Sequence, residues 1–343
     1  MKISVVMPTL NSAKYIEVSL KSLMAQTFKE FEVIAVDSGS MDETLNVLDE
    51  YSEKGLNVRV ISACGLSPAL ARNIGIKNSS GDFLAFCDSD DIMKADMLKS
   101  MYETAVSNNA DVVVCDFNMV YPNRTIERFA CLSNGKFNIG KANIVDYYYE
   151  FCAAPKPNNY VWSRLYRRSF FEDNALMFPD VRYSEDHLLN LSLLLKIPKI
   201  VHIGEALYNY MQYDDSAMRM HIKKTNHGLL FLDGFRKAAD TLATADQDIY
   251  ESILAIYAYT RVKSIMFYAW QANLEENGII DAVSVFVSDA QVKKHLSLCI
   301  EQNYIGRYCL LHGLSNDWEN KMRAMLCACI EDSKLPDMCE VFA

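Results

Sequence analysis

The stretch FEVIAVDSGS, residues 31–40, decides the fold, because its mostly apolar first part ends abruptly in small and polar residues. The stretch FLAFCDSDD, residues 83–91, has the same design. Three further short runs rich in Val and Ile occupy residues 3–7, 58–61 and 112–115. Short apolar runs bounded by polar residues are typical of strands that are buried on both faces. We therefore predict a strand at each of these places.

Helical patterns separate the predicted strands. Apolar residues recur at helical spacing within residues 16–23, 45–51 and 97–105, as expected for helices that pack on a sheet. Alternating strands and helices predict an α/β fold, with a mostly parallel, Rossmann-like sheet covered by helices on both faces. Ligands of such sheets bind at the carboxyl ends of the strands. The residues that follow each strand are therefore the first candidates for a functional site.

The region after residue 220 has a different character. Its apolar residues follow long helical patterns at 229–243, 249–271 and 290–303. The chain has 343 residues, which is more than a usual single domain of ~100–200 residues. We therefore expect two domains, residues 1–220 with the sheet and residues 221–343 as a mainly helical C-terminal region.

Composition excludes several classes of protein. Hydrophobic residues make up 50% of the chain and charged residues 23%, which excludes a disordered or collagen-like chain. The net charge of −10 repels nucleic acid and anionic lipid, so we expect no nucleic-acid partner. The 10 cysteines form no Cys-x-x-Cys pair, which favours reduced core residues in the cytoplasm.

Targeting signals are also missing from the sequence. Residues 1–26 do not have the charged, apolar and small-residue order of a signal peptide. No apolar stretch reaches the ~18 uncharged residues that a membrane span needs. We expect a cytoplasmic protein, with peripheral contact at the inner face of the membrane and oligomer formation as open alternatives.

Polar side chains follow three of the predicted strands. Thr9 follows the first, Asp37 follows the second, and Asp88-Ser89-Asp90-Asp91 follows the fourth. We name residues 88–91 the DSDD turn. Its three carboxylates repel one another unless a cation lies among them, and hard oxygen ligands of this kind suit Mg²⁺ or Mn²⁺. The alternative is a helix N-cap and acidic first turn, where carboxylates favour the helix dipole.

Arg72 lies in a predicted helix that begins at Pro68, close enough in the expected fold to reach the same edge of the sheet. A guanidinium there pairs either with a phosphate or with an acidic residue of the DSDD turn. The sequence leaves these two interpretations open.

Six segments follow one another in an order and at spacings that resemble the motifs of family 2 inverting glycosyltransferases. They are PTLN at 8–11, VIAVDSGSMD at 33–42, ARNIGI at 71–76, FCDSDD at 86–91, WSRLYRR at 162–168, and FP at 178–179 followed by SED at 184–186. The resemblance covers about residues 1–220. It implies the GT-A fold of nucleotide-diphospho-sugar transferases.

The resemblance implies a donor site for a nucleotide-diphospho-sugar, with a UDP-sugar as the first choice. In this interpretation Asp37 contacts the nucleotide base. Thr9 and Asp88 contact nucleoside groups, and Arg72 helps to hold the nucleotide. Asp90, together with Asp88, binds the Mn²⁺ or Mg²⁺ that bridges the diphosphate.

The resemblance also implies that Asp186 is the general base, which accepts the proton of the attacking hydroxyl. Because adjacent helical residues point in different directions, we expect Glu185 to turn aside on the acceptor side. Trp162 offers a ring for an acceptor sugar, although Trp is equally common in cores. The implied acceptor is a glycan or a lipid-linked molecule, as in bacterial cell-surface polysaccharide synthesis. The alternative for Glu185 and Asp186 is an acidic first helical turn after Ser184.

Two positions depart from the family pattern. Ser38 stands where the family commonly has a second acid, and Met211 stands where an Arg often follows paired tyrosines. Arg219, Lys223 or Lys224 could replace that Arg at the diphosphate. Two other functions stay open. One is a haloacid-dehalogenase-like, Mg-dependent phosphatase, whose nucleophile loop resembles the DSDD turn, and the other is a catalytically inactive protein that binds nucleotides or glycans.

Overall fold

The computed structural model describes residues 1–121, 127–129, 135–150, 159–181, 184–213, 227–271, 276–312 and 315–331. The chain divides into two compact units, which we name the sheet unit (Met1–Gly140 with Asn158–Tyr213) and the helical unit (Lys141–Pro157 with Asp214–Ala343). Residues 141–157 thus group with the C-terminal helices, although the sequence analysis assigns them to the first domain. The expected boundary at residue 220 lies outside the described residues and stays a prediction.

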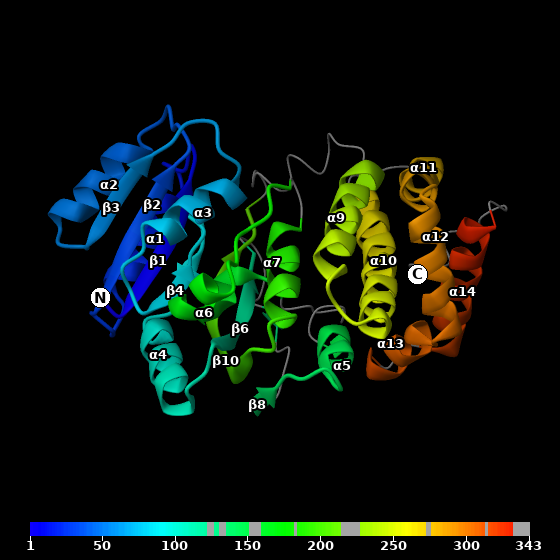
Figure 1. The fold of residues 1–343 in the computed structure, drawn as a ribbon. Helices are drawn as coiled ribbons and strands as arrows, with labels where there is room; N and C mark the ends of the chain where they lie inside the picture. Colours follow the sequence, from blue (N-terminus) through cyan, green and yellow to red (C-terminus); the bar gives the residue numbers. More distant parts are fainter. Residues whose placement is uncertain are drawn as a thin grey trace. The chain divides into compact units, whose positions relative to one another are not determined.

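One 10-stranded mixed sheet forms the centre of the sheet unit (Figure 1). Its order is β3 (Val58–Ser62), β2 (Phe31–Asp37), β1 (Ile3–Thr9), β4 (Phe83–Phe86), β9 (Arg164–Arg167), β6 (Val112–Val120), β10 (Lys199–Met211) and β5 (Ile92–Met93). Two more strands pair with β6 and β10, namely β7 (Glu127–Phe129) and β8 (Gly135–Asn138). Strands β1 to β4 pair in parallel, which confirms the mostly parallel sheet expected from the sequence.

The strand β9 is not predicted from the sequence. It lies antiparallel between β4 and β6, while β6 and β10 are parallel to each other. Because β9 runs antiparallel to β4 and β6, its start lies toward their carboxyl ends: Leu165 pairs with Ala85, the next-to-last residue of β4, and Arg164 pairs with Val114 of β6. The segment just before β9, which carries Trp162, is therefore delivered to the edge of the sheet where ligands of parallel strands bind.

Helices cover both faces of this sheet. Those of the sheet unit are α1 (Ile16–Met24), α2 (Thr44–Glu53), α3 (Pro68–Lys77), α4 (Met97–Asn108), α6 (Arg168–Asp173), α7 (Glu185–Leu194) and the 3₁₀ helix η2 (Val161–Ser163). Successive side chains of β2 point to opposite faces of the sheet. Ile34 and Val36 pack with Ala71 of α3 on one face, while Val33 and Ala35 belong to the larger core on the other face.

The helix α3 carries Arg72, and local sequence determines where this helix begins. The Ser67 hydroxyl accepts a hydrogen bond from the backbone N–H of Leu70, and Pro68 occupies the first turn, where its missing N–H costs nothing. A Cβ atom at Gly75 would lie 2.3 Å from Cγ1 of Val6. Glycine therefore allows α3 to approach β1 closely, and this contact fixes the depth at which Arg72 enters the site.

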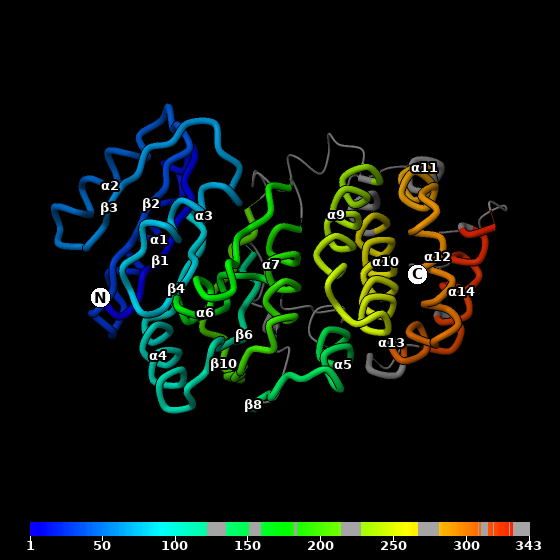
Figure 2. Tube along the Cα trace, viewed as in Figure 1, coloured from blue at the N-terminus to red at the C-terminus, as the bar shows by residue number. Residues whose placement is uncertain are grey.

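The helical unit contains α5 (Ile144–Tyr148), α9 (His227–Leu242), α10 (Gln247–Gln271), α11 (Glu276–Val287), α12 (Ala290–Glu301), α13 (Tyr304–His312) and α14 (Asn316–Ile330). Figure 2 traces this unit from green to red, and α10 packs against α9, α11 and α12. Residues 253–259 of α10 are all buried, as expected for a helix that is apolar on every side. The mainly helical character expected after residue 220 is confirmed for the described residues.

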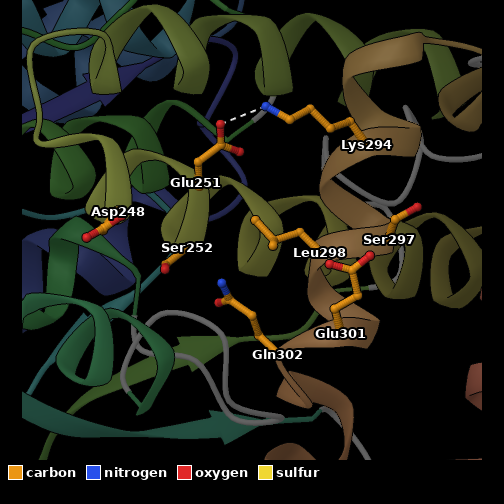
Figure 3. Close-up of a pocket in the computed structure, with 8 residues that line it drawn as sticks. All are labelled: Asp248, Glu251, Ser252, Lys294, Ser297, Leu298, Glu301 and Gln302. Atoms are coloured by element: carbon orange, nitrogen blue, oxygen red, sulfur yellow. Dashed lines mark hydrogen bonds and ion pairs between the residues drawn. The ribbon is translucent and has the colours of Figure 1, made fainter.

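A pocket of about 630 Å³ lies between α10 and α12 of the helical unit (Figure 3). The residues that line it are Asp248, Glu251, Ser252, Lys294, Ser297, Leu298, Glu301 and Gln302. None of the described helices combines the length and the apolar character that crossing a membrane requires.

Candidate active site at the carboxyl ends of the strands

Thr9 and Asp37 lie side by side at the ends of β1 and β2, where their backbones pair in register. The Oδ2 atom of Asp37 accepts hydrogen bonds of 3.0 Å from the backbone N–H groups of Gly39 and Ser40. Its Oδ1 atom accepts from the hydroxyls of Ser40 and Thr9. Asp37 is 1% exposed, so its carboxylate shapes its own loop. The contact of Asp37 with a nucleotide base stays a prediction.

Four short polar residues, which the sequence analysis does not single out as site residues, tie this loop to its neighbours. The Asn11 N–H donates to the Ser40 hydroxyl and its side-chain oxygen accepts from the Met41 N–H, both at 2.8 Å. The hydroxyls of Ser12 and Ser89 are 2.8 Å apart. The loops after β1 and β2 and the DSDD turn therefore form one connected rim. Small hydroxyl and amide residues after strands are the only signal for this rim in the sequence.

The carboxylates of the DSDD turn have three different environments. Asp88 Oδ1 lies 2.9 Å from Arg72 Nη2. Asp91 is fully buried, and its carboxylate accepts hydrogen bonds from the Tyr208 hydroxyl and the Met211 N–H, each at 2.8 Å. Burial and the charges of Asp90 and Asp88 raise the pKa of Asp91 well above its usual range. Arginine pairing and hydrogen bonding thus relieve part of the repulsion for which the sequence analysis invoked a cation.

The role of Asp90 as a metal ligand stays a prediction. Within the described part of the chain, no ion pair involves its carboxylate. Burial, followed by the charge of Asp88, raises the pKa of Asp90 to about 6. No group of three or more His, Cys, Asp or Glu side chains in the described residues is arranged to hold a metal ion. The turn thus offers one or two carboxylate ligands rather than a complete protein cage, which is how Mg²⁺ usually binds beside phosphates.

Arg72 connects the DSDD turn with the first turn of α7. Its guanidinium lies 2.9 Å from Asp88, 3.1 Å from Glu185 and 3.6 Å from Asp186. We name these four residues the Arg72 cluster. Burial lowers the pKa of Arg72, but the charges of Asp88, Asp186 and Glu185 outweigh this effect and raise it overall. Of the two interpretations left open by the sequence, the ion pair is the one observed, and a contact with the nucleotide stays a prediction.

Asp186 is the second residue of α7, which begins directly after Ser184, whose φ of 68° is left-handed. Its Oδ2 atom accepts a hydrogen bond of 3.2 Å from the Val161 N–H, and its Oδ1 atom is buried without a hydrogen-bond partner among the described residues. Burial is the largest effect on Asp186 and raises its pKa to about 7, against the opposing charge of Arg72. A raised pKa near neutrality is a property that general bases share.

Glu185 does not turn aside, contrary to the expectation from helix geometry. Its Oε1 atom approaches the same Nη1 atom of Arg72 as the Oδ1 atom of Asp186. Both carboxylates reach it because a single guanidinium offers several donors in one plane and the long Glu side chain can bend toward it. The two acids therefore share one cation, and their different roles have to come from their other contacts.

Trp162 is a packing residue in this structure, which corrects the expectation of a ring open to a sugar. Its ring is stacked on Tyr160 at 4.5 Å between centroids and on Tyr208 at 4.4 Å, with interplanar angles of 13° and 11°. Phe117 contacts it edge-on, and Trp162 is only 2% exposed. The stack leaves no ring face for an acceptor. The possible replacements for the missing Arg, at 219, 223 and 224, lie outside the described residues.

This arrangement of a mixed sheet, an acidic turn after β4 and paired acids at the start of α7 defines a GT-A type transferase. Residues 4–173, about half of the chain, match the family model described as Glycosyl transferase family 2. The chain therefore belongs to glycosyl transferase family 2 and is a glycosyltransferase.

Similar proteins include the uncharacterized glycosyltransferase EpsJ of Bacillus subtilis, which is 28% identical over 239 residues that cover 65% of this chain and 67% of EpsJ. The glycosyltransferase GlyA of Streptococcus pneumoniae is 26% identical over 289 residues. That match covers 82% of this chain but only 40% of GlyA. The chain thus spans less than half the length of this second relative.

Two solved structures share the fold. The structure of S. aureus TarS 1-349 in complex with UDP-GlcNAc has a TM-score of 0.68 and 22% identity, and the match covers 92% of this chain and 93% of TarS 1-349. The mannosyltransferase PcManGT from Pyrobaculum calidifontis, in complex with GDP-Man and Mn²⁺, has a TM-score of 0.54 and 16% identity, with 96% of this chain and 86% of PcManGT covered. These likenesses confirm the GT-A fold expected from the sequence.

Proposed function

We propose that this glycosyltransferase moves a sugar from a UDP-sugar to a hydroxyl of a glycan or lipid-linked acceptor, with inversion at the anomeric carbon. The observation that carries the proposal is the Arg72 cluster, in which one buried cation joins an acid of the DSDD turn to two acids of α7. Donor-side and acceptor-side carboxylates thereby meet at one point. The TarS complex with UDP-GlcNAc supports a uridine nucleotide as the donor.

In the proposed reaction Asp186 is the general base. The acceptor hydroxyl gives its proton to the Asp186 carboxylate, and its oxygen forms a bond to the anomeric carbon of the donor. The bond from that carbon to the diphosphate oxygen breaks, and the nucleoside diphosphate leaves with the bonding electrons. The buried Oδ1 atom without a hydrogen-bond partner supports this role, because it can accept a hydrogen bond from an incoming hydroxyl.

Asp90 and Asp88 would hold Mn²⁺ or Mg²⁺ together with the diphosphate. The ion, when bound, neutralises charge on the leaving group. The fit rests on Asp90, whose carboxylate oxygens are hard ligands without an ion-pair partner in the described residues, and whose pKa is raised by burial and then by the charge of Asp88. The Mn²⁺ in the PcManGT complex supports the same choice of ion.

For the acceptor and the cellular location, we propose a class of molecule and a compartment. Named relatives include poly(ribitol-phosphate) glycosyltransferases of Staphylococcus aureus and Bacillus spizizenii, which supports a role in cell-surface polysaccharide synthesis. We propose action in the cytoplasm, at the inner face of the membrane. The phosphatase alternative finds no support, because the family match accounts for the DSDD turn within a glycosyltransferase domain.

A donor screen tests the proposed function. The purified chain is incubated with UDP-, GDP- and dTDP-sugars, with Mn²⁺ or with EDTA, and the released nucleoside diphosphate is measured. We expect release from a UDP-sugar that depends on the metal. Metal-dependent release from a different nucleotide sugar alone would correct the donor, and no release from any donor alongside tight UDP binding would favour an inactive binding protein.

A further inference from the structure

The hydroxyl of Tyr208 lies between two parts of the DSDD turn. The backbone N–H of Asp88 donates to this hydroxyl at 3.3 Å, and the hydroxyl donates to Oδ2 of Asp91 at 2.8 Å. Tyr208 and Asp91 are both fully buried. One hydroxyl on β10 therefore connects the first and the last residue of the turn, which lie 117 residues or more away from it in the chain.

The other contacts of Asp91 bind the end of the turn to two further elements. Its Oδ1 atom accepts from the Met211 N–H at the end of β10, at 2.8 Å. Its backbone carbonyl accepts from the hydroxyl of Ser19 in α1, at 2.6 Å. Both carboxylate oxygens of Asp91 are thus engaged by β10, so its side chain is committed to the interior of the sheet unit.

The ring of Tyr208, like its hydroxyl, has fixed neighbours in the structure. It stacks on Trp162, with 4.4 Å between centroids and 11° between planes. Tyr208 also pairs with Met93 of β5, the short strand that directly follows the turn. The aromatic stack and the strand pairing therefore fix the hydroxyl before any ligand arrives. Preorganised support of this kind is what keeps a binding residue within a fraction of an ångström of its working position.

We propose that Tyr208 and Asp91 are positioning residues, which hold the DSDD turn so that Asp88 and Asp90 face the metal ion and the diphosphate. Asp91 is not itself a metal ligand in this account. The proposal rests on the proposed function, because it takes Asp88 and Asp90 as the donor-side carboxylates. The proposal gives a role to Asp91, the third acid of the turn, and to Tyr208, which lies outside the six segments that resemble the family motifs.

The substitution Tyr208→Phe removes the hydroxyl and keeps the ring, so it tests the contribution of the hydroxyl alone. Phenylalanine keeps the stack on Trp162, but it leaves the Asp88 N–H and the Asp91 Oδ2 atom without their shared partner in a buried place. The turn can then relax toward other arrangements. Loss of an outer contact that orients metal ligands typically costs ~10–100-fold in metal affinity, and we expect a loss of this size for Mn²⁺.

Tyr166→Phe is the matched control. Tyr166 is another fully buried tyrosine of the same sheet, and its hydroxyl donates to Oδ1 of Asn190 at 3.2 Å, away from the DSDD turn. Asp91→Asn is the second test variant, because an amide can still accept one hydrogen bond while it removes the charge. Asp91→Asn should therefore weaken Mn²⁺ binding less than Asp91→Ala.

Calorimetry with UDP and Mn²⁺ tests the proposal on the full chain without measuring turnover. We expect the affinity for Mn²⁺ in the presence of UDP to fall ~10–100-fold in Tyr208→Phe and to stay at the wild-type value in Tyr166→Phe, with both variants unfolding cooperatively. Wild-type affinity in Tyr208→Phe would overturn the positioning role. Equal losses in Asp91→Asn and Asp91→Ala, with Tyr208→Phe intact, would make Asp91 a ligand. If the wild-type protein itself binds no UDP with Mn²⁺, the proposed function fails, and the positioning role fails with it.

Discussion

Two charged clusters in this molecule differ in how their charges are matched. In the Arg72 cluster one guanidinium faces three carboxylates, and Asp90 lies close by without an ion pair in the described residues. In the helical unit, Glu251 lies 2.7 Å from Lys294 Nζ and 3.0 Å from His295 Nε2, while Gln247 donates to it as well. We name Glu251, Lys294 and His295 the Glu251 cluster. The first cluster has a surplus of partly buried negative charge, and the second does not.

This difference in charge balance distinguishes a candidate active site from a structural ion pair. Glu251 and Lys294 line a pocket of about 630 Å³ (Figure 3), and the contacts of Glu251 with Lys294 and His295 tie α10 to α12. Burial raises the pKa of Asp186 in the Arg72 cluster and that of the nearby Asp90. Perturbed pKa values cluster at functional sites, which favours the acids around Arg72 as the functional site.

The largest effect is expected at Asp90. Asp90→Ala should reduce metal-dependent transfer below detection, because the turn loses the carboxylate that has no other partner among the described residues. The variant should unfold with the cooperativity of the wild-type protein, since Asp90 supports no described ion pair. Transfer and Mn²⁺ dependence are measured by release of UDP. Wild-type turnover in Asp90→Ala, or turnover that EDTA leaves unchanged, would remove Asp90 from the site.

The next effect is expected at the shared cation. Arg72→Gln leaves Asp88, Glu185 and Asp186 without their counter-charge, so we expect a loss of about 3–5 kcal/mol in the free energy of unfolding. Transfer should fall on the order of 10²-fold, because donor-side and acceptor-side acids lose their common anchor. Urea denaturation and initial rates measure the two effects. Arg168→Gln is the control, because Arg168 pairs with Glu172 on a more exposed part of the same unit, and it should cost no more than about 1 kcal/mol.

The pH dependence gives a smaller and graded effect. Burial raises the pKa of Asp186 to about 7, and a general base works in its ionised form, so transfer should fall about tenfold per pH unit below pH 7. The same shift acts on stability with the opposite sign. The folded protein favours the protonated carboxyl, so the stabilisation contributed by this group is present at low pH and is lost as pH rises through about 7. A rate profile that is flat from pH 5 to 8 would contradict this account.

The smallest effect on transfer is expected in the Glu251 cluster. Glu251→Gln removes the partner of Lys294 and His295, so we expect a loss of about 1–3 kcal/mol in the stability of the helical unit. Donor affinity and transfer should stay at wild-type values in the folded variant. Thermal unfolding and UDP calorimetry measure both. A loss of UDP affinity comparable to that of Asp90→Ala would show that the helical unit takes part in the donor site and would end the contrast between the two clusters.

The sequence predicts the parts of this fold that depend on neighbouring residues. The runs around residues 3–7, 31–36 and 83–87 are strands because a buried strand needs only a short apolar segment, and the polar residues after them lie at one edge as expected. The antiparallel β9 is not predicted, because the segment at 164–167 has only two residues between its two arginines and its pairing partners are distant in the chain.

The partners of the site residues are the part that the sequence could not supply. Arg72 and Glu185 are separated by 113 residues, and whether a guanidinium binds phosphate or carboxylate depends on which side chains the fold brings to it. The sequence does not indicate whether other side chains cover the ring faces of Trp162 or leave them open. The role of Tyr208 depends on one hydroxyl, and nothing in its neighbours along the chain indicates that hydrogen bond.

The most direct test of the central claim compares Asp186→Asn with Glu185→Gln. Both variants keep the shape of the side chain and remove its charge, and both residues contact Arg72, so only a difference in role can separate them. We expect transfer by Asp186→Asn to fall ~10²–10⁴-fold, with the affinity for UDP measured by calorimetry nearly unchanged, and a milder loss in Glu185→Gln. If UDP affinity falls together with transfer in Asp186→Asn, or if Glu185→Gln is the more damaging change, Asp186 is not the base that drives the reaction.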